Sequence, residues 1–136
     1  MIDVENEVYS TVAKALRARF PKLFMSGGEA QPSPSDFPAA VGREMDNSTY
    51  ARSLDSSGEE NHATLMWQWD AYSNKASGRK AECKAIISEI DKQMSKLGFL
   101  RVGSIPSEGP NASPQIYRMI ARYRAVVSKN KIIYRS

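Results

Sequence analysis

Apolar and polar side chains alternate along residues 63–73, and this alternation constrains the fold more than any other feature of the sequence. Leu65, Trp67, Trp69 and Ala71 fall at every second position. Successive side chains of a strand point to opposite faces, so these four residues share one face of a sheet. We therefore predict a long strand here, with two tryptophans that anchor the core.

Two segments show the three- and four-residue apolar spacing of amphipathic helices. The first helix is predicted over residues 3–20, with Asp3 capping its start and Pro21 following its end. The second is predicted over residues 79–97, and Gly98 is placed for the left-handed residue beyond it. Each helix has one apolar face to bury, so both must pack on the strands.

Shorter alternating segments predict further strands at residues 23–26, 37–46, 100–105, 115–128 and 131–135. The connecting segments at residues 27–36, 47–62 and 106–114 are polar and rich in Gly, Pro and Ser, which is typical of loops. Lys129-Asn130 fits a two-residue turn, which predicts a terminal β-hairpin. Few helices and several hairpin-linked strands predict an α+β fold. It is a single domain over residues 1–136, a mostly antiparallel sheet with both helices on one face.

The composition excludes several classes of protein. Cys83 is the only cysteine and His62 the only histidine, so an internal disulfide, a cysteine-based zinc cluster and a multi-histidine metal site are impossible. No apolar run approaches the ~20 residues that span a bilayer. The N-terminus lacks the basic-then-apolar order of a signal peptide. We therefore expect a mature chain that begins near Met1, in a reducing cytoplasm and without a membrane.

Charge is divided unevenly along the chain. Residues 1–62 hold six Lys/Arg and ten Asp/Glu, a net charge of −4, whereas residues 63–136 hold thirteen and five, a net charge of +8. Such asymmetry suggests a polyanionic partner, or self-assembly in which one surface meets an oppositely charged one. The alternative is that both sets of charges are mixed on the outside of one folded domain.

Three arginines fall on one face of the strand predicted at residues 115–128. Arg118, Arg122 and Arg124 alternate with apolar residues, so this face is either solvated or in contact with an acidic partner. The acidic candidates are Glu44 and Asp46, which alternation places together on the strand at residues 37–46, or Glu59 and Glu60 in the loop that follows.

A nucleic-acid-binding module that uses this basic C-terminal face is the alternative function. Tyr117 and Tyr123 interleave the arginines in the sequence. Alternation nevertheless sends them to the opposite face, whereas stacking platforms need aromatic rings and cations on one surface.

Signals for catalysis are weak. The carboxylates Glu44 and Asp46 could bind a hard cation or act in acid–base chemistry, as in a hydrolase or nuclease, but an interface is the better interpretation. Residues 74–80 join a strand to a helix without the Gly-Lys-Ser/Thr ending of a phosphate loop. We therefore expect a protein that is not an enzyme, with no catalytic residue, cofactor or metal.

The sequence resembles the tail terminator, or tail-completion, proteins of long-tailed bacteriophages. The likeness spans nearly the whole chain in the same order. Its residues are Phe37-Pro38, Glu44-Met45-Asp46-Asn47-Ser48-Thr49-Tyr50, Trp69-Asp70-Ala71-Tyr72-Ser73-Asn74-Lys75, Gly78-Arg79-Lys80-Ala81-Glu82, Leu97-Gly98-Phe99, Ile116-Tyr117-Arg118, Arg122-Tyr123 and Ile133-Tyr134-Arg135. These are scaffold residues, and none forms a catalytic signature.

The resemblance implies a virion protein at the head-proximal end of the tail, assembled in the bacterial cytoplasm. Members cap the tail tube as a ring, which the resemblance implies is a hexamer of identical chains. The ring stops polymerisation of the major tail tube protein and offers a joining surface to the head–tail connector protein. DNA passes through its lumen without being read. We predict an interface between subunits or with a partner at Glu44, Asp46, Tyr50, Arg52, Glu59, Glu60, Arg118, Arg122 and Arg124.

Overall fold

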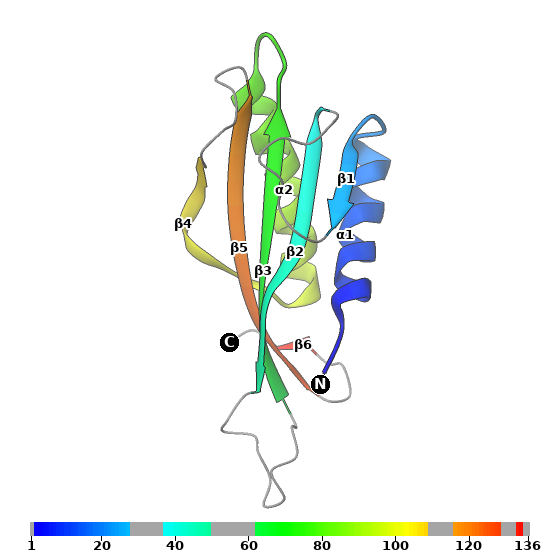
Figure 1. Ribbon diagram of the computed structural model, residues 1–136, viewed down its shortest axis with the longest axis vertical. Coiled ribbons are helices and arrows are strands. Elements are labelled where there is room, and N and C mark those ends of the chain that lie inside the picture. The colour runs from blue at the N-terminus through cyan, green and yellow to red at the C-terminus, as the bar shows by residue number, and fades with distance from the viewer. Residues whose placement is uncertain (1, 28–36, 50–61, 109–115, 129–132, 135–136) are drawn as a thin grey trace, which may run out of the picture.

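The computed structural model describes residues 2–27, 37–49, 62–108, 116–128 and 133–134. Helices α1 and α2 lie side by side on one face of a single sheet, so the α+β class predicted from the sequence is confirmed (Figure 1). The element bounds are α1 Glu5–Arg19, β1 Phe24–Gly27, β2 Ala39–Thr49, β3 His62–Ser73, α2 Arg79–Leu97, β4 Leu100–Glu108, β5 Tyr117–Ser128 and β6 Ile133–Tyr134.

The strand order is β1-β2-β3-β5-β4, and β6 also pairs with β5. All of these pairings are antiparallel except the short β1–β2 pair, which is parallel. The antiparallel pairing of β5 with β6 confirms the predicted terminal hairpin, while its expected turn at Lys129-Asn130 lies outside the described residues.

Both helices have local signals at their ends, although the N-cap residue of α1 is Val4 and not the predicted Asp3. The carboxylate of Asp3 accepts the backbone N–H of Glu5 at 3.0 Å, which satisfies one free donor at the start of α1. Gly98 ends α2 with φ of 101°, the left-handed conformation that glycine adopts without strain. Its neighbour Phe99 donates its backbone N–H to the carbonyl of Met94 at 2.9 Å.

The core forms between the helices and one face of the central strands. Trp67 and Trp69 are almost fully buried there, at 1% and 0% exposure, as their alternation predicts. The two indoles stack at 5.9 Å between ring centroids, and Tyr9 of α1 stacks on Trp69 at 5.8 Å. On β5 the same face holds Met119, Ala121, Tyr123, Ala125 and Val127.

Gly42 of β2 leaves the space that Trp69 occupies. The two residues are paired across β2 and β3, and a Cβ built on Gly42 would lie 2.4 Å from atoms of the indole six-membered ring. No side chain fits there unless the indole moves. The absence of a side chain at position 42 is therefore a packing requirement of the core.

We predict that Gly42→Ala lowers the free energy of unfolding by about 1–3 kcal/mol, because overpacking forces side chains out of their preferred rotamers. Urea denaturation measures the loss. Trp69→Phe removes much of the clashing ring, so the double variant should lose less stability than the two single changes together. Simple additivity in this cycle would contradict the assigned contact.

Candidate interaction surface on the helix-free face of the sheet

The strand pairing defines which side chains line the sheet face that carries no helix. Paired residues of neighbouring strands point to the same face, so the pairing can be followed as rows across the sheet. From β2 through β3 and β5 to β4, these rows are Ala39–Tyr72–Arg118, Val41–Asp70–Ile120, Arg43–Gln68–Arg122–Val102 and Asp46–Met66–Arg124–Leu100.

A buried polar network occupies the part of this face around Asp70. The Asp70 carboxylate is 1% exposed and accepts hydrogen bonds from Arg118 at 2.6 Å and from Gln68 at 2.9 Å. The Tyr72 hydroxyl is a further donor at 3.5 Å, and the Arg118 guanidinium lies 5.5 Å from the centre of the Tyr72 ring. Arg122 extends the network by donating from Nε to Gln68 at 3.0 Å.

Arg118 therefore has an acidic partner within its own chain. The sequence predicted that this arginine meets a carboxylate of another subunit, but its side chain is only 13% exposed and pairs with Asp70. The signal was present in the sequence, since alternation along both strands sends Asp70 and Arg118 to the same side. Only the strand register could show that they are near neighbours across β3 and β5.

Beyond this network, exposed arginines and apolar side chains lie together where β5 meets β4, while Ala39 and Val41 of β2 are buried. Arg122 and Arg124 are exposed, and the apolar residues beside them belong to β4, which alternation along β5 alone could not reveal. Leu100 and Val102 of β4 pair directly with Arg124 and Arg122. We call the whole set the apolar–arginine patch: Met45, Leu100, Val102, Arg122 and Arg124.

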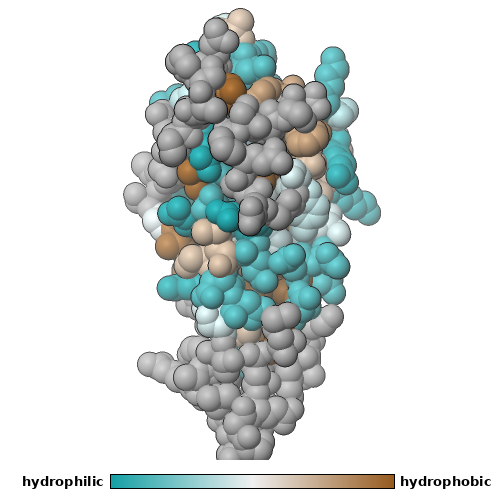
Figure 2. Space-filling model, in the orientation of Figure 1, coloured by the Kyte–Doolittle hydropathy of each residue, from teal (hydrophilic) through white to brown (hydrophobic). Residues whose placement is uncertain are grey.

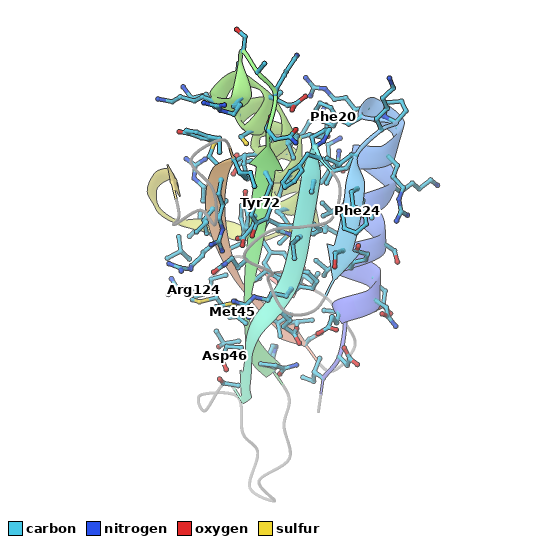
Figure 3. All side chains as sticks on the ribbon, turned by 45° about the horizontal axis from the view of Figure 1, so that its top comes forward. Phe20, Phe24, Met45, Asp46, Tyr72 and Arg124 are labelled. Carbon is cyan, nitrogen blue, oxygen red and sulfur yellow. The ribbon has the colours of Figure 1, made fainter. Side chains whose placement is uncertain are left out.

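The figures show the composition of this side of the molecule. Figure 2 shows hydrophobic side chains among hydrophilic ones over the sheet. Met45, Asp46 and Arg124 lie on the same side of the sheet in Figure 3. The patch is thus a surface feature that the helices leave uncovered.

A bulge in β2 separates the two acidic residues that were predicted to lie together. Glu44 pairs with Trp67 and Asp46 pairs with Met66, so Met45 is an extra residue between them. Glu44 consequently points to the helix side, whereas Asp46 points to the helix-free side. The prediction of one acidic strand face was wrong, because the extra residue Met45 interrupts the alternation of side chains between the two faces. Tyr50, Arg52, Glu59 and Glu60, the other predicted interface residues, lie outside the described residues.

Glu44 lies in an acidic environment at the start of α1. Burial raises the pKa of Glu44 to about 7, and the charges of Glu5 and Asp3 act in the same direction. The Glu44 carboxyl shares a hydrogen bond with Glu5, which also raises the pKa, while a bond with Asn47 lowers it. Asn47 in turn donates to the carbonyl of Ile2 at 2.7 Å, so the bulged segment is tied to the residues preceding α1.

Helix α2 presents a second cationic surface. Lys80, Lys84, Lys92 and Lys96 are exposed and separated by multiples of four residues, so they lie along an oblique row on its outer side. The acids of α2 have partners in the body of the protein. Ser73 bonds to Glu82, Arg19 and Gln93 bond to Glu89, and Arg101 and Tyr123 bond to Asp91.

The one cysteine of the chain lies in the core. The Cys83 thiol is buried, and burial raises its pKa to about 12, so it stays protonated and weakly nucleophilic. Within the described ranges, no three His, Cys, Asp or Glu side chains gather in a way that could hold a metal ion. Neither described helix combines the length and apolar character that crossing a bilayer requires.

Comparison with known protein families finds no family model that matches the chain, and comparison with curated proteins finds no match either.

We predict that Asp70→Ala lowers the free energy of unfolding by about 3–5 kcal/mol, because it leaves the Arg118 charge buried without its partner. Chemical denaturation measures this loss. Arg122→Gln is the matched control. Because Arg122 is exposed, this substitution should lower the free energy of unfolding by no more than about 1 kcal/mol. Equal effects of the two changes would show that Arg118 and Asp70 are not a buried pair.

The raised pKa of Glu44 predicts that stability depends on pH. The folded chain holds this proton up to about pH 7, whereas the unfolded chain releases it near the ordinary value of 4.5. The folded state therefore loses stability as the pH rises from the ordinary value to about 7. Glu44→Gln should be more stable than the parent at about pH 8 and no more stable at about pH 4.

Thermal melting across this pH range measures the effect. Asp46→Asn is the control, because it removes an exposed carboxyl on the opposite face of the same strand. A parent-like pH profile in Glu44→Gln would assign the dependence to other groups.

Proposed function

We propose that this protein is a structural assembly protein of a long-tailed bacteriophage, a tail terminator that caps the tail tube as a ring. In this role it stops polymerisation of the tube protein and offers the surface that joins the tail to the head. It performs no catalysis, and DNA passes through the ring without being read. The natural location is the head-proximal end of the tail in the virion, and the ring is a hexamer.

The observation that carries this proposal is the apolar–arginine patch. Protein interfaces are enriched in arginine, methionine and apolar side chains, because the guanidinium pairs with carboxylates while its stem still packs against apolar neighbours. Here Arg122 and Arg124 pair across strands with the exposed Val102 and Leu100. Such a surface favours a protein partner over open solvent.

The resemblance of the sequence to tail terminators supports the proposal independently of the patch. A ring also requires two different surfaces on each subunit, which meet head to tail around the circle. The sheet layer and the helix layer present unlike surfaces on opposite sides of the chain. Because the two sides of the subunit differ, one side of each subunit can contact the other side of the next subunit all the way around a ring.

Non-specific nucleic-acid binding is the second candidate function, and the lysine row of α2 is the observation that favours it. Lysines act as point charges for phosphates without reading base sequence. The C-terminal arginine face is a weaker candidate, because Arg118 is paired with Asp70 and the neighbouring Tyr72 is fully buried. A buried ring cannot stack on a base.

Light scattering and electron microscopy of the purified protein test the proposal. We expect closed rings, and we expect their addition to growing tail tubes to stop elongation. A protein that stays monomeric and leaves tube length unchanged contradicts the proposal.

Adding duplex DNA at about 50 mM and about 200 mM salt distinguishes the second function. A monomer that binds DNA strongly only at the lower salt concentration would support it. Loss of that binding in a variant with all four α2 lysines changed to glutamine, but not in Arg122→Gln/Arg124→Gln, would locate the DNA on α2.

A further inference from the structure

The exposed large apolar side chains of the described residues lie on one side of the sheet. They are Met45, Leu100 and Val102, at 41%, 44% and 40% exposure. Leu100 and Val102 lie on the helix-free face through their pairing with β5, and Met45 lies in the β2 bulge beside Asp46. The apolar surface that a partner would cover is therefore concentrated on this side of the sheet.

The Arg122 guanidinium has donors to offer a partner. The bond from Arg122 Nε to Gln68 uses one of the five donors of that guanidinium. Arg43 lies in the same row and adds a further positive charge to this face. Arg43, Arg122 and Arg124 outnumber Asp46, the one carboxylate in these rows that is exposed, so this surface carries positive charge.

The chain has one complementary surface among its described residues. The other exposed carboxylates are Asp3, Glu5 and Glu7, which lie together at the start of α1. Glu44, Asp70, Glu82, Glu89 and Asp91 are partly or fully buried, and most of them have hydrogen-bond partners inside the protein. The first turns of α1 are therefore the acidic surface best placed to meet a cationic patch.

We propose that the apolar–arginine patch of one subunit docks on the acidic start of α1 of the next subunit. This inference rests on the proposed ring and names the two surfaces that close it. The patch lies on the helix-free face and α1 on the opposite face of the same sheet. The contact is consequently heterologous, which is the kind that generates rings.

Charge argues for a second copy in this head-to-tail orientation. In a two-fold symmetric dimer, the patch would meet itself, and Arg122 and Arg124 would face the same residues of the partner. Such like-charge contacts are unfavourable, whereas the acidic start of α1 neutralises the arginines and leaves the apolar side chains to pack.

Two charge-reversed variants test the pairing. Arg122→Glu/Arg124→Glu reverses the patch, and Glu5→Arg/Glu7→Arg reverses the start of α1. Each variant alone should need a roughly 100-fold higher concentration than the parent to assemble, because like charges then meet at every contact. Sedimentation velocity measures the assembled fraction. All four residues are exposed, so both variants should fold. The changes remove the bonds of Arg122 with Gln68 and of Glu5 with Glu44, and thermal melting measures that cost.

The equimolar mixture of the two variants is the decisive measurement. In a ring where the two variants alternate, each reversed patch meets a reversed α1 start. Each unchanged patch then meets the unchanged α1 start of its neighbour. We therefore expect the mixture to recover rings with an even number of subunits at the concentration that suffices for the parent. Lys80→Glu/Lys84→Glu, which changes charge equally on the outer side of α2, should assemble like the parent.

The outcomes separate this inference from the function on which it rests. Assembly of either single variant like the parent overturns the pairing and leaves the ring proposal standing. Loss of assembly in both variants without recovery in the mixture also overturns the pairing. A parent chain that never assembles overturns both. If a reversed variant fails to fold, Arg122→Gln/Arg124→Gln and Glu5→Gln/Glu7→Gln replace the pair, and each should weaken assembly less strongly.

Discussion

The packing of Trp67 and Trp69 against the helices is the constraint on which the rest of this structure depends. Both indoles belong to the helix-facing side of β3, where they stack on each other and on Tyr9. Because a strand sends alternate residues to opposite faces, burying the tryptophans fixes the direction of Gln68, Asp70 and every other residue of β3. A shift of one residue would move both indoles to the helix-free face and turn Asp70 toward the helices and the apolar core.

The opposite face is organised by a different interaction. The central strand is buried on both sides near its end, and Asp70 lies there with little access to water. A buried carboxylate needs an opposite charge and hydrogen-bond donors, which Arg118 and Gln68 provide. This network holds β3 and β5 in register on the outer side, while the indoles hold them on the inner side. The exposed arginines further along β5 are thereby left at the surface, among apolar neighbours.

The proposed function depends on this difference between the two faces of the sheet, of which only one is covered by helices. One layer of helices cannot cover both sides of a sheet, so the free side must be polar, covered by other segments, or matched to a partner. The apolar–arginine patch exposes large apolar side chains beside arginines, and exposure of apolar side chains to water is unfavourable. The acidic start of α1 offers a complement on the opposite side of the same chain. A subunit with two such surfaces suits assembly into a closed ring.

The sequence by itself determined the α+β class, both helices, the terminal hairpin and the helix-facing residues of β3 and β5. These features follow from periodicities of two and 3.6 residues, which are local properties of the chain. Only the tertiary structure decided which residues meet across strands. It paired Arg118 with Asp70, placed Leu100 and Val102 beside the arginines, and set Glu44 and Asp46 on opposite faces through the extra residue Met45. Strand pairing and bulges join residues far apart in sequence, and their choice depends on the packing of the whole sheet, which no local pattern encodes.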